Sequence, residues 1–156
     1  MLRPCSAARL GISMSQRAPL SPKPGTPAHR AWNMSRIRGK DTKPELTVRR
    51  LLFADGFRYR LHGADLPGRP DIVFRSRKKV IFVHGCFWHQ HSGCRNANIP
   101  KTRTDFWIEK LTGNVSRDQV VLRQFSEKGW SALVIWECET KDVERLRVKL
   151  HEFLSY

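Results

Sequence analysis

Residues 80–94 read VIFVHGCFWHQHSGC, an apolar run that passes directly into a turn crowded with metal-binding side chains. The segment VIFVH has the pattern of a strand buried on both faces. Two cysteines and three histidines lie within residues 83–94. Phe87 and Trp88 stand between these candidate ligands, although large aromatic side chains are usually at least partly buried. The stretch therefore predicts a buried strand that ends in a metal-binding turn.

A structural zinc site is the chemistry that these residues favour. Structural zinc takes four tetrahedral nitrogen or sulfur ligands and is rich in cysteine. Cys86, His91 and Cys94 come from one turn, and Cys138 ends a later predicted strand. Two neighbouring strand ends would bring the four together. Three thiols cannot all form disulfides with one another, and an intracellular protein seldom uses disulfides. The alternative is a set of buried thiols with surface histidines.

The sequence on both sides of this stretch predicts a mixed sheet flanked by helices. Thr42 and Glu45 have the spacing of a helix capping box, and Pro44 is tolerated in a first helical turn. Apolar residues then recur at helical or strand spacing along the chain. The predicted order is α-β-β-β-α-β-α: helix 42–55, strands 57–61, 71–74 and 80–84, a long helix from 104 to about 128, strand 131–138 and a last helix from 140.

One carboxylate is expected near the end of the central strand. Asp71 begins the second predicted strand, and Val83 and His84 end the next one twelve residues later. A tight hairpin would bring these residues to one region of the sheet. An aspartate and a backbone carbonyl suit Mg²⁺, which nucleases hold against the scissile phosphate. A Pro-Asp pair is also common in turns. Glu45 has two interpretations. It either serves only as the last residue of the capping box, or its carboxylate reaches the ligands around the Mg²⁺ and positions a water.

His84 and His89 remain available if His91 binds zinc. Histidine transfers protons near neutral pH and can donate a hydrogen bond to a phosphate oxygen. The two residues flank the aromatic pair, and we therefore expect them to take part in chemistry on a phosphate.

The chain is strongly basic, which favours a polyanionic partner. It has 156 residues, enough for one domain with a core, and a formal net charge of +15. Residues 1–40 hold eight Lys or Arg and no acid, so the rest of the chain still carries about +7. Nucleic acid is favoured over a membrane because no basic amphipathic helix with an aromatic face is present. A merely basic, soluble protein is the alternative.

Residues 1–33 have the composition of a disordered leader, and residues 34–156 are expected to form the folded domain. The leader is rich in Pro, Ser, Ala and Arg, lacks periodicity and contains Cys5. Met14 and Met34 are alternative start sites to Met1. No apolar run is long enough to cross a membrane and no secretory signal is evident, so an intracellular, cytoplasmic protein is expected.

Four motifs together resemble the very short patch repair endonucleases. They are LPGRPDIVF (66–74), VIFVHGCFWHQHSGC (80–94), KTRTDFWIEKLTGNVSRD (101–118) and VIWEC (134–138). The resemblance runs from about Met34 to Cys138. It implies a fold like that of PD-(D/E)xK restriction endonucleases. It also implies an enzyme that nicks DNA 5′ to the thymine of a T·G mismatch, the product of 5-methylcytosine deamination.

The resemblance assigns roles to individual residues. Asp71 and the main-chain carbonyl of Val83 would bind Mg²⁺, His84 and His89 would serve the phosphate chemistry, and Glu45 would complete the shell of water and metal. The acid and lysine of the usual (D/E)xK element are replaced by Val83 and Gly85. That departure favours chemistry assisted by histidine. Structural zinc would be held by Cys86, His91, Cys94 and Cys138.

The same resemblance gives the aromatic pair a function. Phe87 and Trp88, with His89, would insert between base pairs at the mismatch, where unstacking costs less than in sound duplex. Without the resemblance, packing of both rings into the core would be the leading interpretation. The remaining DNA contacts that it implies are Met34 from the opposite groove, Lys110 and Asn114 at base edges, and Arg103 and Arg117 at phosphates.

The sequence thus predicts a monomeric, bacterial, nucleoid-associated repair nuclease with Mg²⁺ as catalytic and Zn²⁺ as structural cofactor. Double-stranded DNA is its substrate, and a functional link to a cytosine-5 methyltransferase and to mismatch-repair proteins is expected. Two alternatives stay open: a zinc-stabilised DNA-binding module without cleavage, and a restriction-type nuclease that acts on undamaged DNA.

Overall fold

The computed structural model describes residues 21–36 and 39–155. The chain divides into two units, one up to Arg38 and one from Gly39 onward. Helix α1 (Pro27–Ser35) belongs to the first unit; the hydroxyl of Thr26 accepts a hydrogen bond from the His29 amide, and Pro27 occupies the first turn. Part of this helix falls in the stretch predicted as a leader. Cys5 and Met14 lie outside the described residues.

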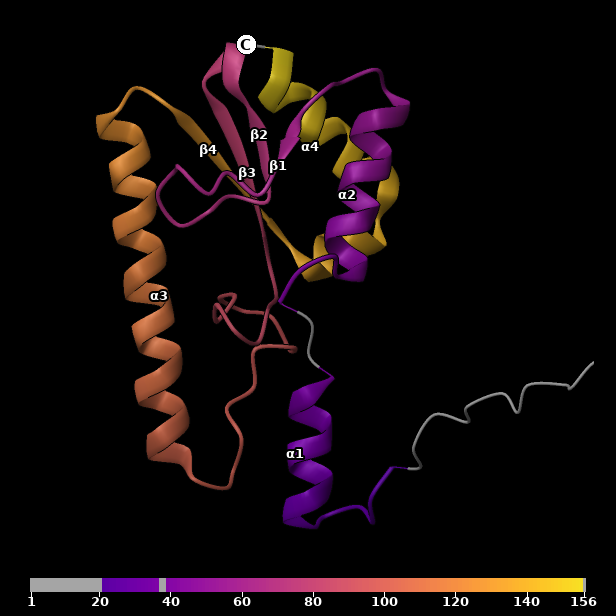
Figure 1. Ribbon diagram of the computed structural model, residues 1–156, viewed down its shortest axis with the longest axis vertical. Coiled ribbons are helices and arrows are strands. Elements are labelled where there is room, and N and C mark those ends of the chain that lie inside the picture. Colours follow the sequence, from indigo (N-terminus) through magenta and orange to yellow (C-terminus); the bar gives the residue numbers. More distant parts are fainter. Residues whose placement is uncertain (1–20, 37–38, 156) are drawn as a thin grey trace, which may run out of the picture. The chain divides into compact units, whose positions relative to one another are not determined.

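The second unit is a mixed four-stranded sheet with helices on both faces, as predicted (Figure 1). The strand order is β1-β2-β3-β4, in which β3 and β4 are parallel and the other pairs are antiparallel. The elements are α2 (Lys43–Ala54), β1 (Arg60–Leu61), β2 (Ile72–Phe74), a 3-10 helix (Arg75–Arg77), β3 (Lys79–His84), α3 (Thr104–Glu127), β4 (Ser131–Trp136), a second 3-10 helix (Glu137–Lys141) and α4 (Val143–Ser155).

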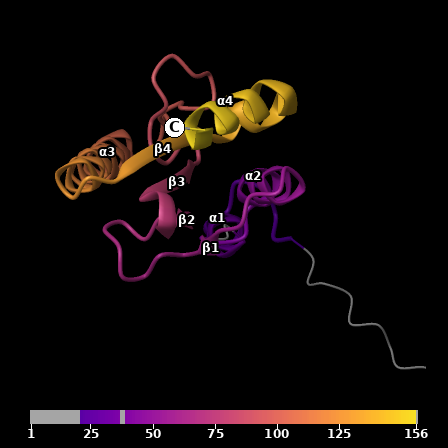
Figure 2. The same ribbon diagram turned by 90° about the horizontal axis from the view of Figure 1, so that it is seen from above.

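Two apolar clusters hold the three layers together. Successive residues of a strand point to opposite faces. Accordingly, Ile72 and Ile81 pack with α2 and α4, while the adjacent Val73 and Val80 pack with α3 residues such as Phe125. Seen from above, α3 lies on one side of the sheet, with α2 and α4 on the other (Figure 2). Because helices cover both faces of the sheet, the strand residues 80–83, VIFV, are all apolar.

The capping box predicted at the start of α2 is half present: Thr42 caps the helix, but the Glu45 carboxylate accepts the Asp41 amide in place of the Thr42 amide. The Glu45 amide donates to the Thr42 hydroxyl at 3.4 Å, and that hydroxyl donates to the Glu45 carboxylate at 2.8 Å. At the other end of the domain, the last carbonyls of α4 are capped from the sheet, because Arg77 donates to Leu154 and Lys79 to Phe153, each at 2.6 Å. Cations at a helix C-terminus also interact favourably with its dipole.

Three boundaries differ from the prediction. The strand predicted at 57–61 is reduced to Arg60–Leu61, and Leu61, predicted on the buried face, is 44% exposed. Leu61 lies on β1, the edge strand of the sheet, where it pairs with Ile72. The turn predicted at 75–79 is a 3-10 helix followed by Lys78 with φ 49°. Strand β4 ends at Trp136, so Cys138 lies in the following 3-10 helix.

Helix α3 extends past the sheet, which corrects the predicted apolar stripe. Its 24 residues span about 36 Å at 1.5 Å per residue, whereas the six residues of β3 span about 20 Å. Leu111 and Phe125 are buried, but Ile108, predicted on the same stripe, is 47% exposed. Figure 1 shows the N-terminal part of α3 beside the loops that follow β3 rather than beside the strands.

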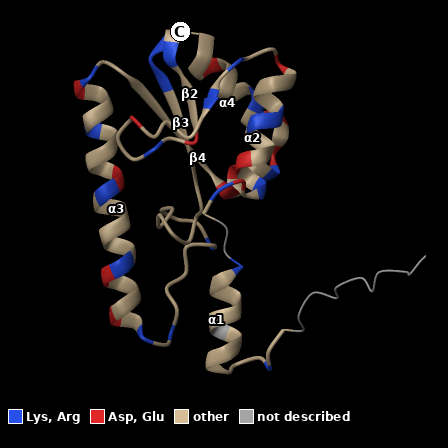
Figure 3. Cartoon of the chain, in the orientation of Figure 1, with Lys and Arg blue, Asp and Glu red and all other residues tan. Residues whose placement is uncertain are grey.

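Among the residues that the structure describes, none of the helices has the length and apolar content needed to span a bilayer. Lys and Arg are distributed over α2, α3 and α4 alongside acidic residues (Figure 3). The positive net charge alone therefore does not locate a binding surface, and the arrangement of particular side chains has to do so.

Candidate functional site

Asp71 and the end of β3 lie together, as the hairpin argument predicts. Strands β2 and β3 are antiparallel, so the residue before β2 lies beside the last residues of β3. The Val83 amide donates to Oδ2 of Asp71 at 2.7 Å. Burial raises the pKa of Asp71, the charge of Glu45 adds to this rise, and the Val83 amide and Arg49 oppose it. A carboxylate in such a position is suited to bind a cation.

A cavity of about 440 Å³ opens at this edge of the sheet. It is lined by residues from α2, the loop before β2, the end of β3 and α3. Among the predicted site residues, those that line it are Glu45, Asp71, Val83, His84, His89 and Arg117.

His84 and His89 stack on each other with ring centroids 3.8 Å apart and an interplanar angle of 11°. Nδ1 of His89 lies 2.5 Å from Oδ2 of Asp118, and Nδ1 of His84 lies 4.0 Å from the same oxygen. Burial lowers the pKa of His84 to about 4; the charge of His89 contributes to the shift and that of Asp118 opposes it. His84 is therefore neutral at physiological pH and does not form an ion pair with Asp118.

Asp118 was not predicted from the sequence. A carboxylate hydrogen-bonded to an imidazole orients the ring and stabilises positive charge on it, as in hydrolases that use a histidine as general base. The signal that could have found it is its position four residues after Asn114 on the same helix. Asn114 and Asp118 therefore lie on the face of α3 that contacts residues 88 and 89.

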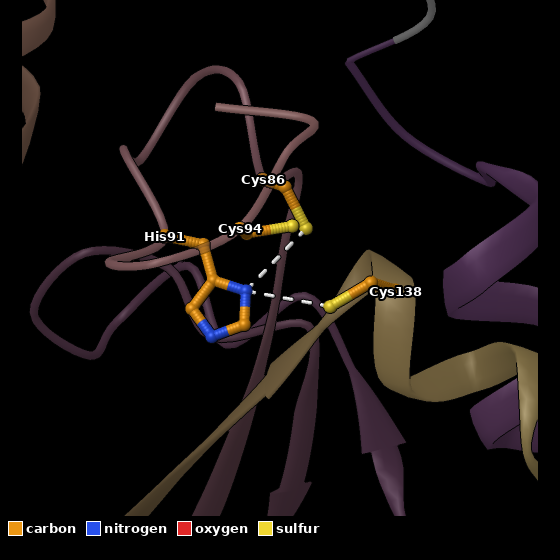
Figure 4. A group of neighbouring side chains, drawn as sticks. All are labelled: Cys86, His91, Cys94 and Cys138. Atoms are coloured by element: carbon orange, nitrogen blue, oxygen red, sulfur yellow. Dashed lines mark hydrogen bonds between the residues drawn. The ribbon is translucent and has the colours of Figure 1, made fainter. Parts of the chain in front are cut away.

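Cys86, His91, Cys94 and Cys138 converge on one point (Figure 4). Their ligand atoms lie within 4.8 Å of one another, with Nδ1 of His91 3.7 Å from Sγ of Cys86 and 3.3 Å from Sγ of Cys138. Zinc–sulfur and zinc–nitrogen bonds of about 2.3 and 2.0 Å in a tetrahedron separate those atoms by roughly 3.5 Å. The predicted ligand set is thus assembled in a geometry that fits zinc.

The segment 85–94, called the ligand turn below, contacts both the sheet and α3. His91 stacks on Trp136 at the end of β4, with ring centroids 4.2 Å apart and an interplanar angle of 6°. The side-chain amide of Asn114 donates to the Trp88 carbonyl at 3.0 Å. Burial raises the pKa of the Cys86 thiol to about 12, so a thiolate there requires a nearby cation.

Phe87 and Trp88 are neither fully exposed nor part of the core. Both rings are half-buried, with centroids 5.0 Å apart, and they contact Trp107 of α3 at 5.4 and 6.1 Å. Phe106, which is 44% exposed, packs on Trp107. Trp107 was missed by the sequence analysis, although it lies in the quoted motif 101–118. The aromatic cluster, Phe87, Trp88, Phe106 and Trp107, lies at the end of α3 that extends past the sheet.

The remaining predicted DNA contacts are spread over α3 and α1. Lys110 is exposed, and Arg117 donates to the Asn114 side-chain oxygen at 3.3 Å. The Arg103 guanidinium lies 4.7 Å from the Phe106 ring centre. Met34 is 49% exposed and belongs to the first unit, so its position is described only within α1.

Comparisons with known proteins add a family. The sequence model described as "DNA mismatch endonuclease Vsr" matches residues 25–95. The chain is 47% identical over 130 residues to the type II nicking enzyme V.XorIIP of Xanthomonas oryzae pv. oryzae. The aligned region covers 83% of this chain and 95% of the relative.

Two further relatives have similar coverage. The type II nicking enzyme V.NmeAIP of Neisseria meningitidis serogroup A is 43% identical over 129 residues, 83% of this chain and 91% of its own length. The DNA mismatch endonuclease Vsr of Escherichia coli is 44% identical over 119 residues, 76% of each chain.

Proposed function

The chain belongs to the Vsr family of DNA mismatch endonucleases, and from this premise we propose that it nicks one DNA strand 5′ to the thymine of a T·G mismatch. The observation that carries the proposal is the cavity at the strand ends, where a buried aspartate, a glutamate and two stacked histidines meet. In this proposal the domain has the restriction-endonuclease-like fold and includes residues 34–156.

The proposed catalytic cation is Mg²⁺, held by Asp71 and the main-chain carbonyl of Val83. Oδ2 of Asp71 accepts the Val83 amide. Oδ1 accepts no hydrogen bond from residues 21–36 or 39–155, so this oxygen is left for a cation. Carboxylate and carbonyl oxygens are the ligands that Mg²⁺ prefers. When bound, Mg²⁺ stabilises charge on the phosphate and makes a water more acidic. Glu45, at the same cavity, would position that water.

His89 is the proposed general base or acid. Asp118 fixes the ring through Nδ1, so the other nitrogen, Nε2, remains to accept a proton from water or to donate one to the leaving oxygen. His84, which burial keeps neutral, would donate a hydrogen bond to a phosphate oxygen and support the stacked ring of His89. Arg117, which also lines the cavity, would contact a phosphate.

Zinc in the proposed structural site would hold the ligand turn against the sheet. Cys86 precedes Phe87 directly, so a fixed Cys86 also restricts the backbone of the aromatic pair. Phe87 and Trp88 would then wedge into the mismatched step together with His89, and Trp107 would complete the apolar face of the wedge. Base stacking on aromatic side chains is worth about 1–3 kcal/mol per base. A weakly stacked T·G step makes the wedge selective.

The remaining contacts complete the proposal. Lys110 and Asn114 would read base edges, Arg103 and the basic leader would meet phosphates, and Met34 would enter from the opposite groove. Asn114 already donates to the Trp88 carbonyl, so base recognition by its amide would require this bond to exchange. We further propose a monomer that acts on bacterial DNA inside the cell, with a functional link to a cytosine-5 methyltransferase and to mismatch repair.

A second candidate is nicking of undamaged DNA at a specific sequence. It is favoured by the names of V.XorIIP and V.NmeAIP, which describe type II nicking enzymes. The same cavity would serve both reactions, so the difference would lie in whether the aromatic cluster needs a weakened base step.

Nicking assays on matched duplexes test the proposal. Duplexes that differ only in T·G against T·A, with and without Mg²⁺, are incubated with the wild type and with Asp71→Asn. We expect Mg²⁺-dependent cleavage of the thymine strand of the T·G duplex alone, and none by Asp71→Asn. Cleavage of the paired duplex at equal rate would establish the second candidate. Binding to the T·G duplex without cleavage under any of these conditions would favour a DNA-binding module.

A further inference from the structure

The carboxylate of Glu45 is almost fully occupied by partners from α2 and from the two residues before it. Oε2 accepts the Asp41 amide at 3.0 Å and Nη2 of Arg49 at 2.8 Å, and Oε1 accepts the Thr42 hydroxyl at 2.8 Å. A carboxylate offers about four acceptor positions, two on each oxygen. Only one position on Oε1 therefore remains for a group in the cavity that Glu45 lines.

Arg49 is the charged partner in this arrangement, and it is buried. It is 7% exposed and Glu45 is 4% exposed. Its second nitrogen, Nη1, donates to Asp41 at 2.5 Å, so the guanidinium bridges two carboxylates. The backbone carbonyl of Arg49 accepts the Tyr59 hydroxyl at 2.9 Å, which ties this turn of α2 to the segment before β1.

The placement of Arg49 is costly for stability. Among the described residues, its Nε is the one buried side-chain nitrogen or oxygen without a hydrogen-bond partner. A buried donor without a partner loses the hydration that it had in the unfolded chain. Because the guanidinium is rigid and planar, the two bonds through Nη1 and Nη2 fix the direction of Nε as well. The fold thus keeps a buried charge pair at a position where an apolar residue would pack at lower cost.

Arg49 holds Glu45 from outside the cavity. Glu45 and Asp71 both line the cavity, whereas Arg49 is not among its lining residues. The bond from Nη2 of Arg49 to Glu45 therefore takes up none of the space in which a cation would bind.

We propose that Arg49 is a positioning residue of the active site, which fixes Glu45 so that one acceptor position of Oε1 faces the cation site. This inference rests on the proposed function, because it assigns Glu45 and Asp71 to a divalent cation. The role is distinct from that of the helix N-cap, since the Thr42 hydroxyl accepts the Glu45 amide without Arg49.

The test compares Arg49→Met, Arg49→Lys and, as a control, Arg147→Met. Arg147 of α4 pairs with Asp55, which follows the C-terminal end of α2 and does not line the cavity. Two quantities are measured for each variant. The first is Mn²⁺ binding to the protein without DNA, followed by the EPR signal of the free ion. The second is the Mg²⁺ concentration that gives half-maximal nicking of the T·G duplex.

We expect Arg49→Met to weaken Mn²⁺ binding and to raise the half-maximal Mg²⁺ concentration, each by about 10-fold, the lower range for loss of a partner behind a metal ligand. Arg49→Lys keeps the charge but not the rigid fork, so a loss of about threefold is expected. Arg147→Met should leave both quantities unchanged, because Glu45 keeps all of its contacts.

Unchanged Mn²⁺ binding in Arg49→Met would overturn the inference, and so would an equal loss in Arg147→Met. If Arg49→Met does not fold, Arg49→Lys decides, and Mn²⁺ binding equal to that of the wild type would then refute the role. Failure of the proposed function is seen separately. In that case the wild type does not nick the T·G duplex, while the comparison of Mn²⁺ binding between variants remains valid.

Discussion

The sheet core and the ligand turn reach a defined structure by different means. In the core, apolar side chains from three layers exclude water, and Phe125 and Ile135 have no exposed surface. In the ligand turn, residues 85–94, Cys86 is the buried residue and its neighbours are half-buried or exposed. That turn is held by four candidate zinc ligands and by contacts to Trp136 and Asn114.

Substitutions in the two regions should therefore have different effects. Loss of a core contact changes the free energy of unfolding of the whole domain. Loss of a turn contact should instead change catalysis and DNA binding while the sheet remains folded, because few buried apolar contacts join the turn to the core.

The largest effect is expected in the core. Phe125→Ala removes a fully buried ring and should lower the free energy of unfolding by about 3–5 kcal/mol. Urea unfolding measures it. Phe53→Ala, a change of the same size at a 58% exposed position, should cost less than about 1 kcal/mol. Similar losses in both variants would contradict a core centred on the sheet.

The second effect breaks the turn alone. Cys94→Ser should lower the zinc content and reduce nicking at least about 100-fold, since loss of partners behind a metal ligand already costs 10–100-fold. The free energy of unfolding should fall less than in Phe125→Ala. Metal analysis and nicking assays measure the difference, and Ser92→Ala, at an exposed position of the same turn, is the control. Full nicking by zinc-free protein would refute a structural role for the metal.

The third effect concerns the contact between the turn and α3. Asp118→Asn keeps the shape of the side chain but removes the charge that orients His89, so nicking should fall by about 100-fold, the lower range for a general acid or base. Affinity for the T·G duplex should stay constant. Asp105→Asn, an exposed aspartate of the same helix, should have no effect on either quantity. A loss of binding without loss of rate would assign Asp118 to recognition instead.

The smallest effect sharpens the comparison at the aromatic cluster. Trp107→Ala should weaken binding to the T·G duplex by about 10-fold, within the 1–3 kcal/mol expected for one stacked base. Affinity for the paired T·A duplex should change less, so discrimination between the two should decrease. Fluorescence anisotropy with both duplexes measures this. Val120→Ala, on an exposed part of α3, is the control. Equal weakening on both duplexes would argue that Trp107 only supports the fold.

Predictions that rested on one local rule are confirmed. The buried strand that contains VIFVH, the helix N-cap at Thr42 and the hairpin that brings Asp71 to Val83 are all present. The four candidate zinc ligands also lie together. In each case the spacing along the chain already limits the geometry.

Residues whose roles depend on distant partners were not predicted. Asp118 and Trp107 belong to a helix whose buried side was assigned from periodicity, yet both side chains contact residues of the ligand turn. Arg49 reads as an ordinary helical arginine until its burial and its two carboxylate partners are known. Leu61 was misassigned because strand periodicity does not reveal where a sheet edge ends.

The unbroken length of α3 has one more consequence. Trp107 and Asp118 lie on the same uninterrupted helix. They are eleven residues apart, which corresponds to about 16 Å along the helix axis. The helix thus fixes the distance between the aromatic cluster and His89, the partner of Asp118. One residue inserted between Trp107 and Asp118 would rotate Trp107 relative to Asp118 by about 100° around the helix axis. A residue added beyond Glu127 would leave their relative position unchanged.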